Sequence, residues 1–102
     1  MFHINGETWH IIMVSPGHPA LCRSRGDCSI GCCDDNTKCI YICDTLTEEM
    51  IRKVLYHELT HAAMFSYNVD LSYKQEEMLA DMLATYGHEI LYKANEIISR
   101  IE

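Results

Sequence analysis

Two histidines four residues apart, His57 and His61, constrain this chain more than any other feature of its sequence. They lie within residues 47–66, where apolar residues recur with helical spacing. On an α-helix, residues four apart differ by roughly 40° of rotation and about 6 Å of rise. Both imidazoles therefore leave the predicted helix on one face and can reach the same metal ion. Glu58 follows the first histidine and lies beside the position where that ion would bind water.

The pentapeptide His57-Glu58-Leu59-Thr60-His61 has the H-E-x-x-H form of zinc hydrolases. In that motif the two histidines bind the metal and the glutamate acts as general base. The alternative is a surface helix on which two histidines and a glutamate fall together by coincidence. A catalytic zinc also needs a third protein ligand and an open position, so the sequence should supply another ligand elsewhere.

A second helix is predicted over about residues 73–100. Ser72 and Gln75 form a capping box at its start, and Gly87 is a place where it can kink or break. Its apolar residues recur at spacings of three and four, namely Leu79, Met82, Leu83, Tyr86, Ile90, Ala94, Ile97 and Ile101.

The start of this second helix supplies the candidate third ligand, Glu77. Asp81 lies four residues later on the same face, where it can accept a hydrogen bond from the far ring nitrogen of a ligand histidine. Glu76, about 100° away around the helix, is the reserve candidate. The alternative is that these acids only complement the helix N-terminus, but that role does not explain Asp81.

The first half of the chain is β-rich. Strands are predicted over residues 8–14 and 38–43, with a turn at 15–19, a loop at 20–37 that includes a short strand near 29–33, and a hairpin turn at 34–37. At 102 residues the chain is expected to form a single domain spanning 1–102. The predicted fold class is α+β, with a small antiparallel sheet packed on two main helices in a minimal zincin-like arrangement.

The net charge of −7 and the absence of a basic block argue against nucleic acid or an anionic membrane as a direct partner. A protein partner with a basic segment is compatible with this charge. The N-terminus has no basic region, and the apolar run at 11–14 is too short for a signal sequence or a membrane span. We therefore expect a cytoplasmic protein.

Six cysteines lie between Cys22 and Cys43, including the pairs Cys28/Cys32 and Cys39/Cys43 with three residues between them. Reduced thiols, one or more disulfides, or a further metal site are all compatible with this pattern.

His88 is expected to be a surface or core histidine, because it lies about 16 Å from Glu77 along a straight helix.

The two motifs in order resemble the ImmA/IrrE family of metallopeptidases: the pentapeptide His57–His61, then Glu77, Ala80 and Asp81, preceded by Gly31 and a strand with Ile40 and Ile42. The resemblance covers about residues 31–91. Thr60 departs from it, since the family usually has Gly there.

This resemblance implies a gluzincin-type zinc enzyme associated with phages and mobile elements, with Zn²⁺ held by His57, His61 and Glu77 and with Glu58 as catalytic acid/base. It implies a protein or peptide substrate, such as a helix-turn-helix transcriptional repressor. It also implies that strand 38–43 is a sheet edge that an extended substrate can join. The sequence thus predicts a zinc endopeptidase. The alternatives are a non-catalytic zinc-stabilised interaction module and, more weakly, a redox or metal-handling protein built on the cysteines.

Overall fold

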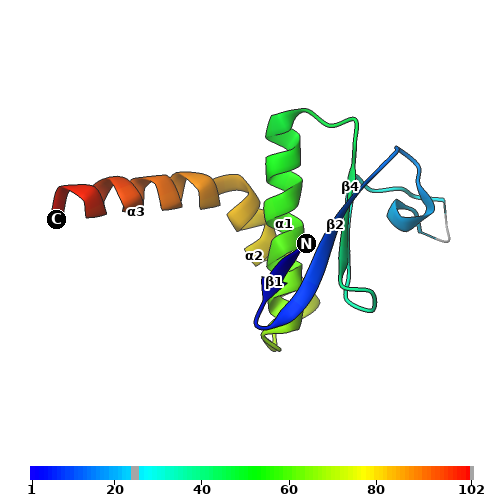
Figure 1. Ribbon diagram of the computed structural model, residues 1–102, viewed down its shortest axis with the longest axis horizontal. Coiled ribbons are helices and arrows are strands. Elements are labelled where there is room, and N and C mark those ends of the chain that lie inside the picture. Colours follow the sequence, from blue (N-terminus) through cyan, green and yellow to red (C-terminus); the bar gives the residue numbers. More distant parts are fainter. Residues whose placement is uncertain (24–25, 102) are drawn as a thin grey trace.

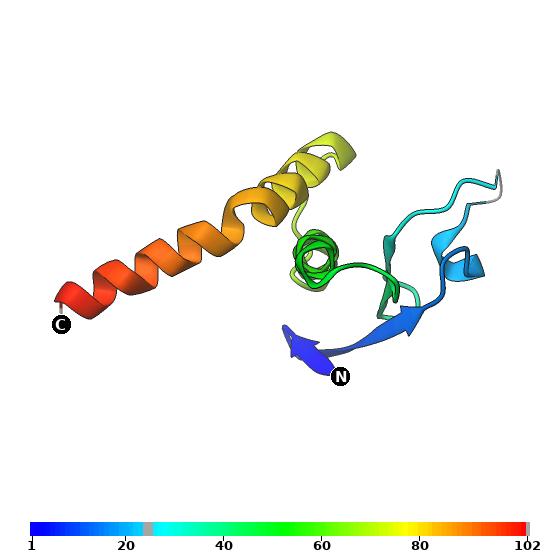
Figure 2. The same ribbon diagram turned by 90° about the horizontal axis from the view of Figure 1, so that it is seen from above.

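A four-stranded sheet packs against one side of helix α1, and helix α2 packs against the other side (Figures 1 and 2). A long helix, α3, continues from α2 and points away from the body of the molecule (Figure 1). The structure is a computed structural model that describes residues 1–23 and 26–101. Its longest dimension is 52 Å, against 31 and 27 Å for the other two, because α3 projects from one end.

The strands and the short 3₁₀ helix η1 come first along the chain, in the order β1 (Phe2–Ile4), β2 (Glu7–Val14), η1 (Pro19–Leu21), β3 (Gly31–Asp34) and β4 (Cys39–Cys43). The helices follow, in the order α1 (Glu48–Ser66), α2 (Tyr73–Met82), the π-helical turn η2 (Leu83–Gly87) and α3 (His88–Ile101). The α+β class predicted from the sequence is confirmed.

The sheet has the order β1-β2-β4-β3 and is mixed. The pairs β1·β2 and β3·β4 are antiparallel, whereas β2 and β4 run parallel, with Ile11 opposite Ile40. The prediction of a purely antiparallel sheet is therefore wrong. The segment between β2 and β3 crosses over one strand position at one end of the sheet; β3 then runs back antiparallel to β2, and β4 returns in the gap between them, parallel to β2. Such a crossover leaves no local signature in the strands themselves.

The expected sheet edge at residues 38–43 is also wrong, because β4 lies between β2 and β3. Strand β3 forms the end of the sheet on that side, and it is β3 that contacts α1 beside the histidines. An extended segment can therefore approach the histidines along β3, but it cannot pair with β4.

The first strand, β1, was not predicted. It forms a hairpin with β2 through Asn5 and Gly6, whose φ angles of 49° and 80° are both positive. A two-residue hairpin turn of this kind favours Asn-Gly, because both central residues must adopt positive φ. The Asn5-Gly6 pair was therefore a readable signal. The hairpin holds the end of α1, since the Asn5 side chain donates to the Ser66 carbonyl at 2.9 Å.

The main core lies between the sheet and α1. Trp9, Ile40 and Ile42 are essentially inaccessible there, and they pack with Val54 and Ala62 of the helix. The Trp9 indole N–H donates to the Ser66 hydroxyl at 2.8 Å, which satisfies the polar atom of the largest buried side chain. This core fixes the rotation of α1, so that the helix face carrying the histidines turns toward α2 and the end of β3.

Both helix starts follow from local capping. The Thr47 hydroxyl accepts from the Met50 N–H, and Ser72 and Gln75 form the reciprocal capping box. The range of α1 agrees with the predicted helix at 47–66. The second predicted helix is interrupted near Gly87. The interruption is a π-helical turn that ends at Gly87, and the chain stays helical on both sides of it.

None of the helices in residues 1–23 and 26–101 is both long and apolar enough to cross a membrane.

Candidate metal centre

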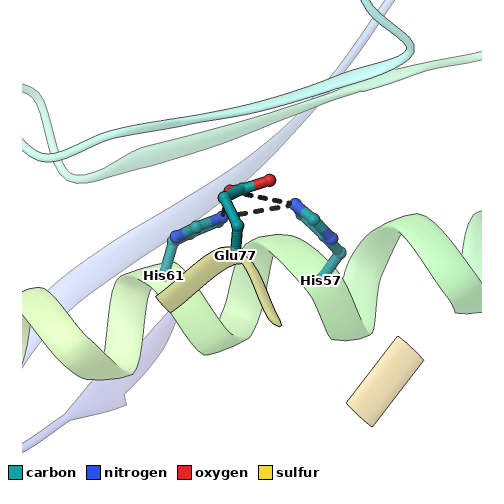
Figure 3. A group of neighbouring side chains, drawn as sticks. All are labelled: His57, His61 and Glu77. Carbon is teal, nitrogen blue, oxygen red and sulfur yellow. Dashed lines mark hydrogen bonds and ion pairs between the residues drawn. The ribbon is translucent and has the colours of Figure 1, made fainter. Parts of the chain in front are cut away.

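Three side chains converge between α1 and α2, and the structure brings together the three predicted ligands His57, His61 and Glu77 (Figure 3). The Nε2 atoms of the two histidines lie 3.3 Å apart. Oε1 of Glu77 lies 2.7 Å from Nε2 of His61 and 3.6 Å from Nε2 of His57. One ligand atom from each residue therefore faces a common point, and the group could hold a metal ion.

The spacing of the two Nε2 atoms suits a small tetrahedral ion. Two imidazole nitrogens that are each about 2.0–2.1 Å from such an ion lie roughly 3.3–3.4 Å apart. The observed distance of 3.3 Å meets this value. The Glu77 oxygen is already at a fitting distance from His57, and it needs to withdraw from His61 by roughly 0.6 Å to coordinate in the same geometry. That withdrawal is within the reach of a half-exposed glutamate side chain.

The other nitrogen of each imidazole is directed at its own carboxylate. Nδ1 of His61 lies 2.6 Å from Oε2 of Glu76, and Nδ1 of His57 lies 3.1 Å from Oδ1 of Asp81. A carboxylate favours the tautomer whose proton is on Nδ1, so both Nε2 atoms keep a free lone pair for a metal. Asp81 thus lies beside the far ring nitrogen of His57, one of the three converging residues.

Glu76, the reserve candidate for third ligand, is not among the three converging groups. Adjacent residues on a helix differ by about 100°, so Glu76 and Glu77 reach opposite edges of the His61 ring. Glu76 occupies the Nδ1 edge and Glu77 the Nε2 edge. The sequence shows two neighbouring acids, but it contains no signal that assigns each to one ring nitrogen.

Glu58, the predicted general base, is only 7% exposed and lies on the face of α1 between the histidines and β3. Burial raises the pKa of its carboxyl, and the nearby Glu77 raises it further, whereas His57 and His61 lower it. Among the described residues, no group donates a hydrogen bond to its carboxylate, so its oxygens are free for a water or a substrate. A carboxylate in this setting can accept a proton beside the histidine pair.

Gly31 at the start of β3 forms the wall opposite α2. A Cβ at this position would overlap Cγ1 of Val54 and would lie 3.4 Å from Cγ of Glu58. The absence of a side chain therefore lets the end strand approach α1 at the level of Glu58. The resemblance included Gly31, but only the packing shows that the strand needs a glycine there.

Two hollows meet at Gly31, His57 and Glu58. One has a volume of about 400 Å³ and extends toward Met50 and Ala84. The other has a volume of about 550 Å³ and extends toward Leu21, Cys32, Phe65 and Tyr73. The histidine cluster thus lies in the middle of an open groove that follows the end of the sheet, and a chain longer than one residue can occupy both sides of it.

His88 lies away from this centre, as expected, and its Nδ1 is 3.3 Å from the Tyr56 hydroxyl.

Among the cysteines, Cys22 and Cys28 form a disulfide, and Cys32, Cys33, Cys39 and Cys43 are free. Burial is the main cause that raises the pKa of the Cys32 and Cys33 thiols, with a further contribution from Glu58. These two thiols therefore stay protonated and are poor nucleophiles.

Comparisons with protein-family models, with curated proteins and with solved structures find no match to this chain. The zincin-like identity and the family that the motifs resemble consequently stay predictions. What the chain can do chemically is therefore inferred from the geometry of the His57/His61/Glu77 group and its surroundings.

Proposed function

We propose that this chain is a zinc-dependent endopeptidase, with His57, His61 and Glu77 as metal ligands and Glu58 as the general base. The single observation that carries the proposal is the pair of Nε2 atoms 3.3 Å apart, each on an imidazole whose Nδ1 faces a carboxylate. Carboxylate–histidine–metal arrangements of this kind orient the ring and increase its basicity. A coincidental histidine pair on a surface helix has no reason to acquire both carboxylates.

The donor set supports zinc as the metal. Two imidazole nitrogens and one carboxylate oxygen are the protein ligands of many catalytic zinc sites, and three protein ligands leave the fourth position open. A zinc ion bound here would polarise a scissile carbonyl and lower the pKa of a water molecule.

The side chains around the site would then perform the remaining steps. Glu58 accepts the proton of the attacking water on its carboxylate and delivers it to the leaving amine. Glu76 and Asp81 hold the two imidazoles in the metal-binding tautomer. Gly31 keeps the strand close to Glu58, so that a peptide lying along β3 passes the general base.

The proposed substrate is an extended segment of a specific protein. The free outer edge of β3 can pair with such a segment through main-chain hydrogen bonds, and the two hollows can receive side chains on either side of the cut. The resemblance of the motifs suggests a helix-turn-helix repressor as that protein. The net charge of −7 favours a basic segment of such a partner over direct contact with nucleic acid.

The metal part of the proposal is tested by elemental analysis of purified protein. We expect one zinc per chain, and loss of that zinc in His61→Ala. The matched control is Glu49→Gln, an exposed change in the first turn of the same helix, which should retain the zinc. Protein that never binds zinc in stoichiometric amount contradicts the proposal.

The catalytic part is tested by incubating the zinc-loaded protein with a complex peptide library and with candidate repressors. Mass spectrometry should detect discrete cuts that a chelator abolishes, that Glu58→Gln reduces by at least about 100-fold and that Glu49→Gln leaves unchanged. A protein that binds zinc and shows no Glu58-dependent hydrolysis would instead be a zinc-stabilised interaction module.

A further inference from the structure

Helix α3 carries an apolar surface that nothing in the described part of the chain covers. None of its fourteen residues is buried, and apart from the preceding turn η2 no described element makes more than marginal contact with it. Figures 1 and 2 show it extending from the body with its C-terminal end free of other elements. An isolated helix of this length is only marginally stable in water, so its amphipathic face needs a partner.

The uncovered surface is a continuous stripe along α3. The residues Ile90, Ala94, Ile97 and Ile101 follow spacings of four, three and four, which is the pattern of a helix-pairing seam. Leu91 and Ile98 flank this seam on one side. The isoleucines are exposed by 50–78%. We call these six residues the α3 stripe.

The α3 stripe continues into an apolar groove on the body. This groove has a volume of about 380 Å³, and Tyr56, Leu59, Ala63 and Met64 of α1 line it together with Leu83 and Leu91. It lies on the side of α1 away from the sheet, and none of the three proposed metal ligands lines it. A helix lying along α3 would therefore reach the groove at its far end.

We propose that this surface pairs with a second copy of the same chain, through antiparallel packing of the two α3 helices. In this arrangement Ile90 of one copy lies opposite Ile101 of the other, and Ala94 lies opposite Ile97. The last turn of each α3 then reaches the groove of the other copy. The contact is isologous, so each copy covers the stripe and the groove of the other at the same time.

The exposed area has the size that a stable dimer requires. The chain exposes 7206 Å², whereas a compact monomer of this length exposes about 5,900 Å². The excess is roughly 1,300 Å², and a standard interface covers about 800 Å² on each partner. The radius of gyration shows the same excess, because it is 15.0 Å against about 13 Å for a compact chain of this length.

The charge distribution favours a second copy over an anionic membrane. The charged residues of α3 lie along the flank of the seam that faces away from Leu91 and Ile98, about 100° around the helix from the seam, and they are Glu89, Lys93, Glu96 and Arg100. Two acids and two bases give α3 no net charge, so the −7 of the chain is carried by the rest of the molecule. Two copies of α3 can therefore approach without net repulsion between the helices. A helix that lies on an anionic membrane needs a mostly basic polar face, which α3 lacks.

The test is sedimentation equilibrium of the full chain, from low micromolar to several hundred micromolar concentration. We expect a reversible dimer whose dissociation constant rises at least about 100-fold in Ile97→Glu, because each interface contains the change twice. Ser99→Glu, which adds the same charge on the opposite side of α3, is the matched control and should change the constant less than about threefold. Zinc content measured in parallel should be the same in both variants, since α3 contributes no ligand.

A second variant keeps the test valid if the new charge unfolds α3. Ile97→Ala preserves helix propensity and removes only apolar area, so it should weaken the dimer by about tenfold. A wild-type chain that stays monomeric at the highest concentration overturns the proposal, whether or not it binds anionic vesicles. An equal effect of Ser99→Glu and Ile97→Glu overturns it as well, because the stripe would then not be the contact.

Discussion

Helices α2 and α3 are consecutive parts of one helical segment, yet they relate to the rest of the molecule in opposite ways. The acids of α2 contact the histidines of α1, whereas the isoleucines of α3 stay at least half exposed. The π-helical turn between them adds a residue to the local repeat and so rotates the face that follows it. Continuity of a helix therefore does not give its two halves a common role: α2 completes a site, and α3 offers a surface.

The largest expected difference between the two halves concerns the metal. Glu77→Ala in α2 should raise the zinc dissociation constant by more than about 100-fold, since loss of an outer carboxylate alone costs 10–100-fold. Glu89→Ala in α3 is the matched change and should leave the affinity unaltered, because Glu89 lies outside the centre. Competition with a chelating dye measures both constants. Equal affinities in the two variants would remove Glu77 from the ligand set.

The next difference lies within the metal centre itself. Glu76→Gln and Asp81→Asn should each weaken zinc binding within the range of about 10–100-fold. We expect Glu76→Gln near the upper end, because its carboxylate is 16% exposed and 2.6 Å from its histidine. Asp81 is 71% exposed and 3.1 Å from its partner, so solvent replaces it more easily. Titration of zinc into the metal-free variants decides the order, and a larger effect at Asp81 would contradict this assignment.

A smaller effect is expected on the side of the site opposite α2. Gly31→Ala should reduce the free energy of unfolding by about 1–3 kcal/mol, because the new methyl group overlaps Val54 in the core. Urea unfolding monitored by Trp9 fluorescence measures this change. If the free energy of unfolding stays the same, β3 has moved away from α1 to make room for the methyl group. The rate of peptide hydrolysis should then fall without any change in zinc content.

The smallest effect is expected at the junction of α2 and α3. A Cβ at Gly87 would meet Leu83 and Tyr56 at 3.5 Å, an ordinary van der Waals distance. Gly87→Ala should therefore be neutral or stabilise the chain by up to about 1 kcal/mol, since alanine costs less conformational entropy in a helix. The same urea experiment serves as the measurement. A lower free energy of unfolding in Gly87→Ala would show that the π-helical turn requires glycine, and it would contradict this prediction.

Local signals accounted for much of the fold and of the candidate site. The start of α1 follows from the Thr47 cap, and the start of α2 follows from the pairing of Ser72 with Gln75. These signals involve residues within one helical turn, so they can be read without a fold. The Asn5-Gly6 hairpin is equally local, because both of its central residues adopt the positive φ that this dipeptide favours.

Other features could not be read from the sequence because they depend on residues far apart. The parallel pairing of β2 with β4 arises because the chain skips one strand position after β2 and β4 later fills that position. The position of β3 at the end of the sheet depends on the same crossover. As a result β3, and not β4, offers the edge that an extended segment could join. The pairing of Cys22 with Cys28 was one of many combinations among six cysteines.

The sequence by itself determined that His57, Glu58 and His61 share one helix face, because the α-helical repeat fixes the relation of residues three and four apart. It also placed Glu77 and Asp81 on one face of a second helix. Only the tertiary structure decided how these faces meet, which edge of the His61 ring each of two adjacent glutamates occupies, and that α3 leaves its isoleucines uncovered. The physical reason is that periodicity sets direction around a helix axis, whereas the packing of α1 between the sheet and α2 sets what each direction encounters.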